Sequence, residues 1–156
     1  MSKANATPAG FHGATPYLCC RDAARALDFY RAAFGAVETM RLAEPSGRIG
    51  HAEFKIGDAV IMVSDEYPEM KVVSPQALGG TPVALHLYVP DVDRFCARAV
   101  EAGATLARPP ADQFYGDRAA QLQDPFGHRW SIATRIEEVS TEEMQRRYDA
   151  MMKGGK

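Results

Sequence analysis

Histidine, glutamate and tyrosine side chains at four positions have the chemistry of a catalytic or metal-binding site. His51 and Glu53 are separated by one residue, so on a β-strand both would point to the same face. Together with His86 they would offer a divalent cation two imidazoles and a carboxylate. His86 also lies two residues before Tyr88, and this pair would suit acid–base chemistry without a metal. The residues alone leave a metal enzyme, a metal-free enzyme and a surface strand as open alternatives.

The three cysteines favour packing over chemistry. Cys19 and Cys20 are neighbours on a predicted strand, so their side chains point to opposite faces and cannot pair with each other. Neither they nor Cys96 show the CxxC spacing of zinc sites. We expect three reduced thiols packed as small hydrophobic groups, and therefore a cytoplasmic location.

The composition is that of an ordinary globular protein. Of the 156 residues, 46% are hydrophobic and 24% are charged, and the net charge is −2. Basic and acidic residues are mixed along the chain, which argues against a nucleic-acid partner or a membrane surface. Residues 1–13 are small and polar, without the apolar run of a signal peptide or a membrane span, and we expect a flexible N-terminal arm.

Hydrophobic periodicity predicts two similar halves. The first half contains a helix between Asp22, a candidate N-cap, and Gly35, a typical C-terminal stop. The second half repeats this pattern between Asp91 and Gly103, and an offset of 69 residues superimposes Asp22 on Asp91. The predicted strands are Thr15–Cys20, Val37–Ala43, His51–Ile56 and Ala59–Ser64, then Val83–Val89, Leu106–Arg108 (broken by Pro109-Pro110), Ala119–Gln123 and Arg129–Thr134.

The remaining segments connect or extend these halves. We expect residues 67–81 to be a linker between module one (14–66) and module two (82–136). Residues 137–156 form a C-terminal helix with a frayed tail, because Ser140 and Glu143 have the spacing of a capping box. Methionines at helical spacing on this helix indicate a packing face.

Several motifs resemble the vicinal-oxygen-chelate (glyoxalase/bleomycin resistance/dioxygenase) superfamily over residues 14–136. The resemblance lies in Ala26-Leu27-Asp28-Phe29-Tyr30 with Phe34-Gly35, and in Asp124-Pro125-Phe126-Gly127-His128-Arg129-Trp130. The segments Tyr115-Gly116-Asp117-Arg118 and His86-Leu87-Tyr88-Val89 are similar to its PhnB-like branch. The resemblance implies an α+β fold: two βαβββ modules form curved mixed sheets around a central groove, with helices outside and an extra C-terminal helix.

The resemblance also places the family's four metal-ligand positions, which are normally His, Glu or Gln. Here they fall on Thr15, Met62, Ala84 and Ser131. Hydroxyl, thioether and methyl groups cannot replace imidazoles and carboxylates around a divalent cation. We therefore expect no cofactor, and the alternative is a divalent metal at the non-family set His51, Glu53 and His86.

Strand alternation sorts the remaining side chains between the groove and the core. Trp130 is predicted to lie in the core under the helices, and His128, in a turn, at the surface. The groove is predicted to bind a small molecule through Thr15, Tyr17, Met62, Ser64, His86, Tyr88, Arg118, Gln121 and Ser131.

Three hypotheses follow for the function. The first is a binding module for a small, partly aromatic molecule, with drug sequestration as a role by analogy to the family. The second is a lyase or dioxygenase-type enzyme that uses either the non-family metal site or His86 as a catalytic acid–base. The third is a structural or regulatory protein that acts as a homodimer, with the C-terminal helix in the interface.

Overall fold

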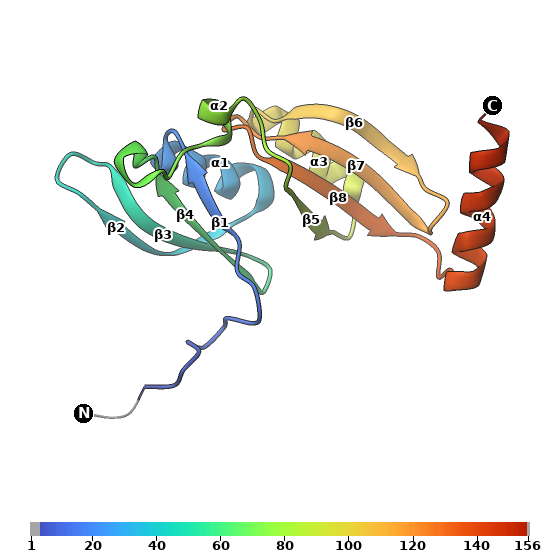
Figure 1. Cartoon of the computed structure of the whole chain (residues 1–156), viewed down its shortest axis with the longest axis horizontal. Coiled ribbons are helices and arrows are strands. Elements are labelled where there is room, and N and C mark those ends of the chain that lie inside the picture. Colours follow the sequence, from blue (N-terminus) through green and yellow to red (C-terminus); the bar gives the residue numbers. More distant parts are fainter. Residues whose placement is uncertain (1–3, 156) are drawn as a thin grey trace. The chain divides into compact units, whose positions relative to one another are not determined.

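The computed structural model describes residues 4–155, which fold into two compact units. Unit 1 extends to Thr81 and includes the turn Pro125–Gly127, while unit 2 comprises Pro82–Asp124 and the chain from His128 onward. Each unit contains one four-stranded mixed sheet with helices, so the predicted α+β class is confirmed (Figure 1).

In unit 1 the sheet order is β1-β4-β3-β2, and β1 runs parallel to β4. The other neighbouring strands are antiparallel. The elements are β1 (Tyr17–Cys20), α1 (Ala23–Phe34), β2 (Val37–Ala43), β3 (Ile49–Ile56), β4 (Ala59–Asp65), the 3-10 helix η1 (Pro68–Met70) and α2 (Pro75–Leu78).

Unit 2 repeats this arrangement in the order β5-β8-β7-β6, with β5 parallel to β8. The elements are β5 (Ala84–Tyr88), α3 (Val92–Ala102), β6 (Thr105–Asp112), β7 (Asp117–Gln123), β8 (Arg129–Arg135) and α4 (Thr141–Gly154).

Strand pairing reproduces the repeat found in the sequence. Tyr17 lies opposite Met62 in unit 1, and the residues 69 positions later, His86 and Ser131, lie opposite each other in unit 2. Both helices begin as expected, because Asp22 accepts a hydrogen bond from the Arg25 N–H at 3.0 Å and Asp91 accepts one from the Arg94 N–H at 3.0 Å. The duplicated βαβββ pattern is confirmed.

The core of unit 1 lies between α1 and the sheet. The ring of Tyr30 on α1 stacks on that of Phe54 on β3 at a centroid distance of 4.9 Å, and both residues are buried. The turn Pro125–Gly127 belongs to the same unit: the Phe126 ring lies 6.1 Å from that of Phe29, and the Arg25 guanidinium lies 5.7 Å above it. Aromatic packing therefore joins a late part of the chain to the first helix.

A buried carboxylate organises the core of unit 2. Asp124 accepts hydrogen bonds from the indole Nε1–H of Trp130 and from the backbone N–H of His128, both at 2.9 Å. Trp130 is 1% exposed, which confirms its predicted place in the core. The predicted surface position of His128 is wrong, since it is 8% exposed in a turn that folds back onto Asp124.

One other expectation is wrong. Strand β6 does not break at Pro109-Pro110 but continues to Asp112. It is an edge strand with an irregular register between Arg108 and Ala111, where a proline without an N–H is tolerated. The predicted linker contains η1 and α2, and the N-terminus of α2 is capped by Ser74.

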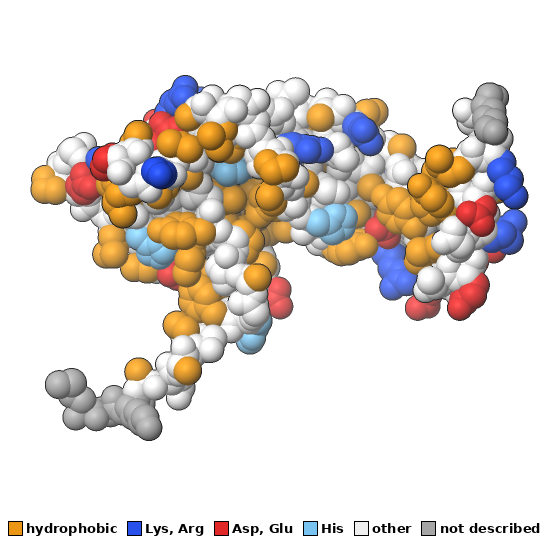
Figure 2. Space-filling model, in the orientation of Figure 1, with side chains coloured by type: hydrophobic (Ala, Val, Ile, Leu, Met, Phe, Trp, Pro, Cys, Tyr) orange, Lys and Arg blue, Asp and Glu red, His pale blue; other side chains and the backbone are white. Residues whose placement is uncertain are grey.

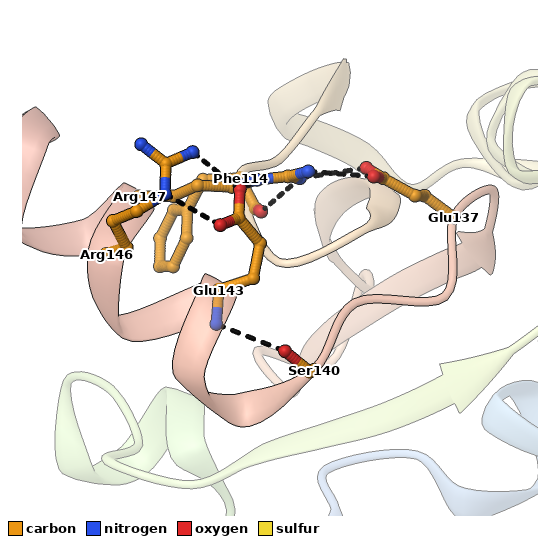
Figure 3. A network of polar contacts seen from close by, with 6 residues as sticks. All are labelled: Phe114, Glu137, Ser140, Glu143, Arg146 and Arg147. Carbon is orange, nitrogen blue, oxygen red and sulfur yellow. Dashed lines mark hydrogen bonds and ion pairs between the residues drawn. The ribbon is translucent and has the colours of Figure 1, made fainter.

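The C-terminal helix α4 is attached to the rest of unit 2 by an ionic network (Figure 3). Ser140 accepts a hydrogen bond from the Glu143 N–H at 3.2 Å, which is the expected cap. The Glu143 carboxylate binds Arg146 and Arg147, and these hydrogen bonds lower its pKa to about 2. Arg147 also donates to Glu137 and to the carbonyl oxygen of Phe114.

Hydrophobic contacts accompany this network. The Phe114 ring lies 5.6 Å from the Tyr148 ring of α4. In Figure 2, hydrophobic side chains gather between α4 and the sheet of unit 2, while charged side chains cover the outer side of α4. Within residues 4–155, no helix is long and apolar enough to cross a membrane.

Removing the Asp124 carboxylate is expected to destabilise unit 2 strongly. Asp124→Ala leaves two buried N–H donors without their acceptor, at a cost of about 2–5 kcal/mol in the free energy of unfolding. Urea unfolding measures this cost. Asp58→Ala, at an exposed aspartate in the β3–β4 turn, is the control and should stay within about 0.5 kcal/mol of the parent protein. Equal stability of the two variants would contradict the assigned role of Asp124.

The thiols are expected to resist alkylation in the folded protein. Burial raises the pKa of Cys19 and of Cys96 to about 11, and Cys20 is fully buried. At pH 8 the thiolate fraction, and with it the alkylation rate, should be on the order of 100-fold lower than in the unfolded chain. Mass spectrometry after iodoacetamide treatment, with and without guanidinium, tests this expectation. Similar rates in both states would overturn it.

Candidate functional site

Six side chains share the face of the unit 1 sheet opposite α1. Pairing of β1, β4 and β3 places Tyr17, Met62 and Glu53 in one row across the strands. Two residues further along β1 and β4, Cys19 lies opposite Ser64. His51, two residues before Glu53 on β3, points to the same face. We call this the unit 1 face: Tyr17, Cys19, His51, Glu53, Met62 and Ser64.

Three residues of the unit 1 face form a chain of hydrogen bonds. The Tyr17 hydroxyl lies 2.8 Å from Nδ1 of His51, and Nε2 of His51 lies 3.1 Å from a carboxylate oxygen of Glu53. The Tyr17 and His51 rings meet edge to face at a centroid distance of 5.3 Å. The side chains of His51 and Glu53 are 24% and 19% exposed, whereas Tyr17 is 56% exposed. The tyrosine is therefore the solvent-facing end of the chain.

A cavity of about 590 Å³ opens beside Tyr17. Cys19 and Ser64 of the unit 1 face line it, and its walls carry the rings of Tyr17 and Tyr67 and the side chain of Met70. Leu18, Gly50 and Val72 complete the lining. Its size and largely apolar walls are typical of small-molecule sites.

The corresponding face of unit 2 carries His86, Tyr88, Gln121 and Ser131. Nδ1 of His86 lies 2.9 Å from the Ser131 hydroxyl, and Gln121 pairs with Ser131 across β7 and β8. The His86 ring meets the Tyr88 ring edge to face at 4.8 Å. The Tyr88 hydroxyl donates to buried Asp117 at 2.8 Å, and this hydrogen bond raises the pKa of Tyr88.

A broader cavity of about 1100 Å³ lies at the Tyr88 end of this face. Tyr88, Tyr115 and Met144 of α4 supply apolar surface, while Asp117 and Arg135 supply charge. Val89, Pro90 and Thr134 also line it. Its volume exceeds that of a typical drug-sized site, which points to an open surface hollow.

Arg118 does not join the predicted groove residues. Strand β7 begins at Asp117, two residues earlier than expected, so alternation turns Arg118 toward α3. Its guanidinium binds Asp93 of α3 with two hydrogen bonds, at 2.7 and 2.9 Å, and Asp112 with one at 2.9 Å. The arginine holds a helix against the sheet, with its donors directed at protein carboxylates.

The four positions that the family resemblance assigns to metal ligands do not fit a divalent cation. Met62 lies between Tyr17 and Glu53 in unit 1, and Ser131 lies between His86 and Gln121 in unit 2. Thr15 precedes β1, and Ala84 opens β5. A thioether, two hydroxyls and a methyl group form no donor set for such an ion.

The alternative metal set is not favoured either. His51 and Glu53 lie in unit 1, where both ring nitrogens of His51 already have hydrogen-bond partners. His86 lies in unit 2, where Nδ1 contacts Ser131. Among residues 4–155, no three His, Cys, Asp or Glu side chains gather in a group that would hold a metal ion.

Sequence reasoning missed part of both cavities. Tyr67, Met70 and Val72 lie in the segment predicted to be a linker, where the sequence has no periodicity that would indicate residues lining a cavity. Nothing in the sequence indicated that Asp117 accepts a hydrogen bond from Tyr88, 29 residues earlier. The spacing of His51 and Glu53 correctly indicated a shared strand face, but nothing in the sequence paired His51 with Tyr17, 34 residues away.

Comparison with known proteins agrees with this fold. Residues 11–132 match the Glyoxalase/Bleomycin resistance protein/Dioxygenase superfamily. The uncharacterized protein Mb0911c of Mycobacterium bovis is 45% identical over 134 residues, which cover 84% of this chain and 88% of that protein. The uncharacterized protein Rv0887c of Mycobacterium tuberculosis is also 45% identical over 134 residues, covering 84% of this chain and 79% of that protein.

Solved structures extend the comparison. TioX from Micromonospora sp. ML1 is 27% identical with a TM-score of 0.62, covering 83% of this chain and 100% of that one. The fosfomycin resistance protein FosX from Listeria monocytogenes, complexed with Mn(II) and sulfate, is 18% identical with a TM-score of 0.62. The match covers 88% of this chain and 97% of that one. At that identity the second likeness concerns the fold alone. The duplicated βαβββ units and the match over residues 11–132 lead to one conclusion: this chain belongs to the Glyoxalase/Bleomycin resistance protein/Dioxygenase superfamily.

Proposed function

We propose that this protein binds a small, partly aromatic molecule without a metal ion at the family's ligand positions. The observation that carries the proposal is the unit 1 cavity of about 590 Å³, walled by Tyr17, Tyr67 and Met70. Tyrosine rings offer flat apolar surface with a polar edge, and methionine adapts to the shape of its partner. A flat molecule with one or two polar groups matches such walls.

The polar groups of the cavity are few and neutral. The Ser64 hydroxyl donates to the carbonyl oxygen of Asp65 at 3.0 Å, which leaves its lone pairs as acceptors. Burial, together with nearby Glu66 and Asp65, raises the pKa of Cys19 to about 11, so its thiol stays neutral at pH 7. Because these two polar side chains are uncharged and the tyrosine rings are apolar, the cavity should bind an uncharged ring system better than a compact anion.

The family context makes antibiotics reasonable candidates. Members with this fold include a fosfomycin resistance protein, although that protein carries Mn(II) and shares only 18% identity. We propose drug sequestration as one role of the site and assign the chain to the PhnB-like branch on its motifs around Tyr88 and Tyr115. Metal-free binding would suit sequestration, which requires affinity but no bond breaking.

Thermal shifts across a panel of aromatic metabolites and antibiotics test the binding proposal. A compound at 100 times its Kd should raise stability by about 2.7 kcal/mol, and therefore Tm by roughly 5–10 °C. Met70→Ala removes apolar contact area from the cavity wall and should weaken that compound's affinity by roughly 5- to 30-fold.

Leu78→Ala is the matched control for Met70→Ala. Leu78 is 71% exposed and Met70 is 70% exposed, both in unit 1, but Leu78 lies outside the cavity. The Leu78→Ala variant should bind the same compound with the affinity of the parent protein. A panel without any shift, or an equal loss in both variants, would count against this cavity as the site.

We also propose that the protein forms a homodimer with α4 in the interface. Tyr148, Met151 and Met152 of α4 are 44%, 51% and 58% exposed, which is a large apolar area for one surface helix. A two-fold dimer is the commonest way to cover such a surface.

Sedimentation velocity tests the dimer. The parent protein should sediment as a dimer at micromolar concentration, and Met151→Lys with Met152→Lys should shift it toward the monomer. Glu142→Lys, on the same helix, serves as a charge control. A specific dimer should have a dissociation constant below roughly 100 µM. A parent protein that is still monomeric at about that concentration would overturn the proposal.

A further inference from the structure

We propose that Tyr17, His51 and Glu53 form a metal-free proton relay that activates the Tyr17 hydroxyl toward molecules bound in the unit 1 cavity. Tyr17 is both the end of the hydrogen-bond chain and a lining residue of that cavity. The relay goes beyond binding, because it gives the site a reversible proton-transfer activity. Its action on a ligand rests on the proposed binding function.

The hydrogen-bond partners fix where the protons lie. An ionised Glu53 carboxylate can only accept, so the imidazole must direct an N–H at it from Nε2. In neutral His51 this leaves the lone pair on Nδ1, which accepts the proton of the Tyr17 hydroxyl. The same order of nucleophile, imidazole and carboxylate activates hydroxyl groups in enzymes of unrelated folds.

Strand pairing holds the three groups in place. Tyr17 and Glu53 flank Met62 in one row across β1, β4 and β3, and His51 stands two residues along β3 from Glu53. Sites built on strands are held more firmly than sites built on loops. The partly buried His51–Glu53 pair lies behind the more exposed Tyr17, so the reactive oxygen is the accessible end of the chain.

Two other tyrosines show what is distinctive about Tyr17. Tyr67 donates to Glu44 and Tyr88 donates to Asp117, both at 2.8 Å, and each carboxylate raises the pKa of its phenol. A carboxylate is a weaker base than an imidazole by about 2 pK units, so it is the poorer acceptor of a phenol proton. Among these three tyrosines, only Tyr17 has its hydroxyl hydrogen-bonded to an imidazole, since the His86 ring meets the ring of Tyr88 and not its hydroxyl.

The proton transfer balances without any further reagent. The Tyr17 oxygen takes an acidic proton from the bound molecule while its own proton passes to Nδ1 of His51. The bound molecule becomes an anion and His51 becomes an imidazolium, which Glu53 stabilises. The reverse transfer, to the same or another atom of the molecule, restores the site. Nothing is oxidised or reduced, and the class of reaction is an isomerisation or an exchange of a proton with solvent.

Benzenesulfonyl fluoride tests the relay without knowledge of the natural ligand. An activated Tyr17 oxygen attacks the sulfur, an S–O bond forms, fluoride leaves, and the phenol proton passes to His51 and then to water. Peptide mass spectrometry gives the labelling rate of each of the six tyrosines. In the native parent protein, Tyr17 should react at least about tenfold faster than Tyr67 and Tyr88, in line with the gain from a positioned base.

Variants of His51 and Glu53 distinguish activation of the Tyr17 hydroxyl from a purely structural role of these residues. His51→Ala should lower Tyr17 labelling to the level of Tyr67, and added imidazole should restore part of it. Glu53→Gln should give a smaller loss, because the amide oxygen still accepts from His51 but carries no charge. Tyr17→Phe should show no label at position 17 and unchanged rates elsewhere.

The outcomes are distinct from those of the binding proposal. Tyr17 labelling no faster than that of Tyr67 and Tyr88 in the native protein would overturn the relay, whatever the variants do. Labelling that is fast but unchanged in His51→Ala would also overturn it. Fast, His51-dependent labelling without any thermal shift in the ligand panel would support the relay and contradict the binding function instead.

Discussion

In each unit, one side chain near the end of the last strand of the sheet accepts a hydrogen bond from the first residue of a helix. This bond ties α1 to the sheet of unit 1 and α3 to the sheet of unit 2. In unit 1 the Asp65 carboxylate accepts the N–H of Ala23, the first residue of α1, at 2.8 Å, and the N–H of Ile49, which opens β3, at 2.6 Å. In unit 2 the Thr134 hydroxyl accepts the N–H of Val92 at 2.9 Å and donates to the Val89 carbonyl at 2.8 Å. Because a helix begins with N–H groups that lack partners, these contacts fix where helix and strand meet.

The positions of the side chains on the unit 1 face follow from how the strands pair next to this junction. Once β1 and β4 are joined in register, alternation aligns Tyr17 with Met62, and β3 adds Glu53 to the row and His51 to the same face. A slip by one residue would turn Tyr17 into the core and Leu18 outward. The proposed cavity and relay therefore depend on the same backbone pairing that builds the core.

Much of this fold could be predicted because it rests on local signals. Asp22, Gly35, Asp91 and Ser140 mark helix ends by their own chemistry, and α1 and β2 have the predicted bounds. Contacts over long sequence separations could not be predicted. Arg118, for example, binds Asp93 of α3, which lies 25 residues earlier in the sequence. The burial of His128 was missed at short range, because the turn closes onto Asp124 only four residues away.

The candidate site also has one part that could be predicted from the sequence and one part that could not. The face shared by Tyr17, Met62 and Ser64 follows from alternation and was predictable. Tyr67 and Met70 were not predictable as walls, because a 3-10 turn places them and such turns leave no period in a sequence.

The turn Pro125–Gly127 has a consequence for how the chain can be divided. It is encoded within the second repeat, yet its Phe126 ring belongs to the aromatic cluster of Phe29 and Tyr30 in unit 1. A fragment cut after Thr81 would keep every strand of its sheet but lose that ring and expose the aromatic side chains beneath it. The two repeats are therefore not interchangeable building blocks, and a severed first half would tend to aggregate.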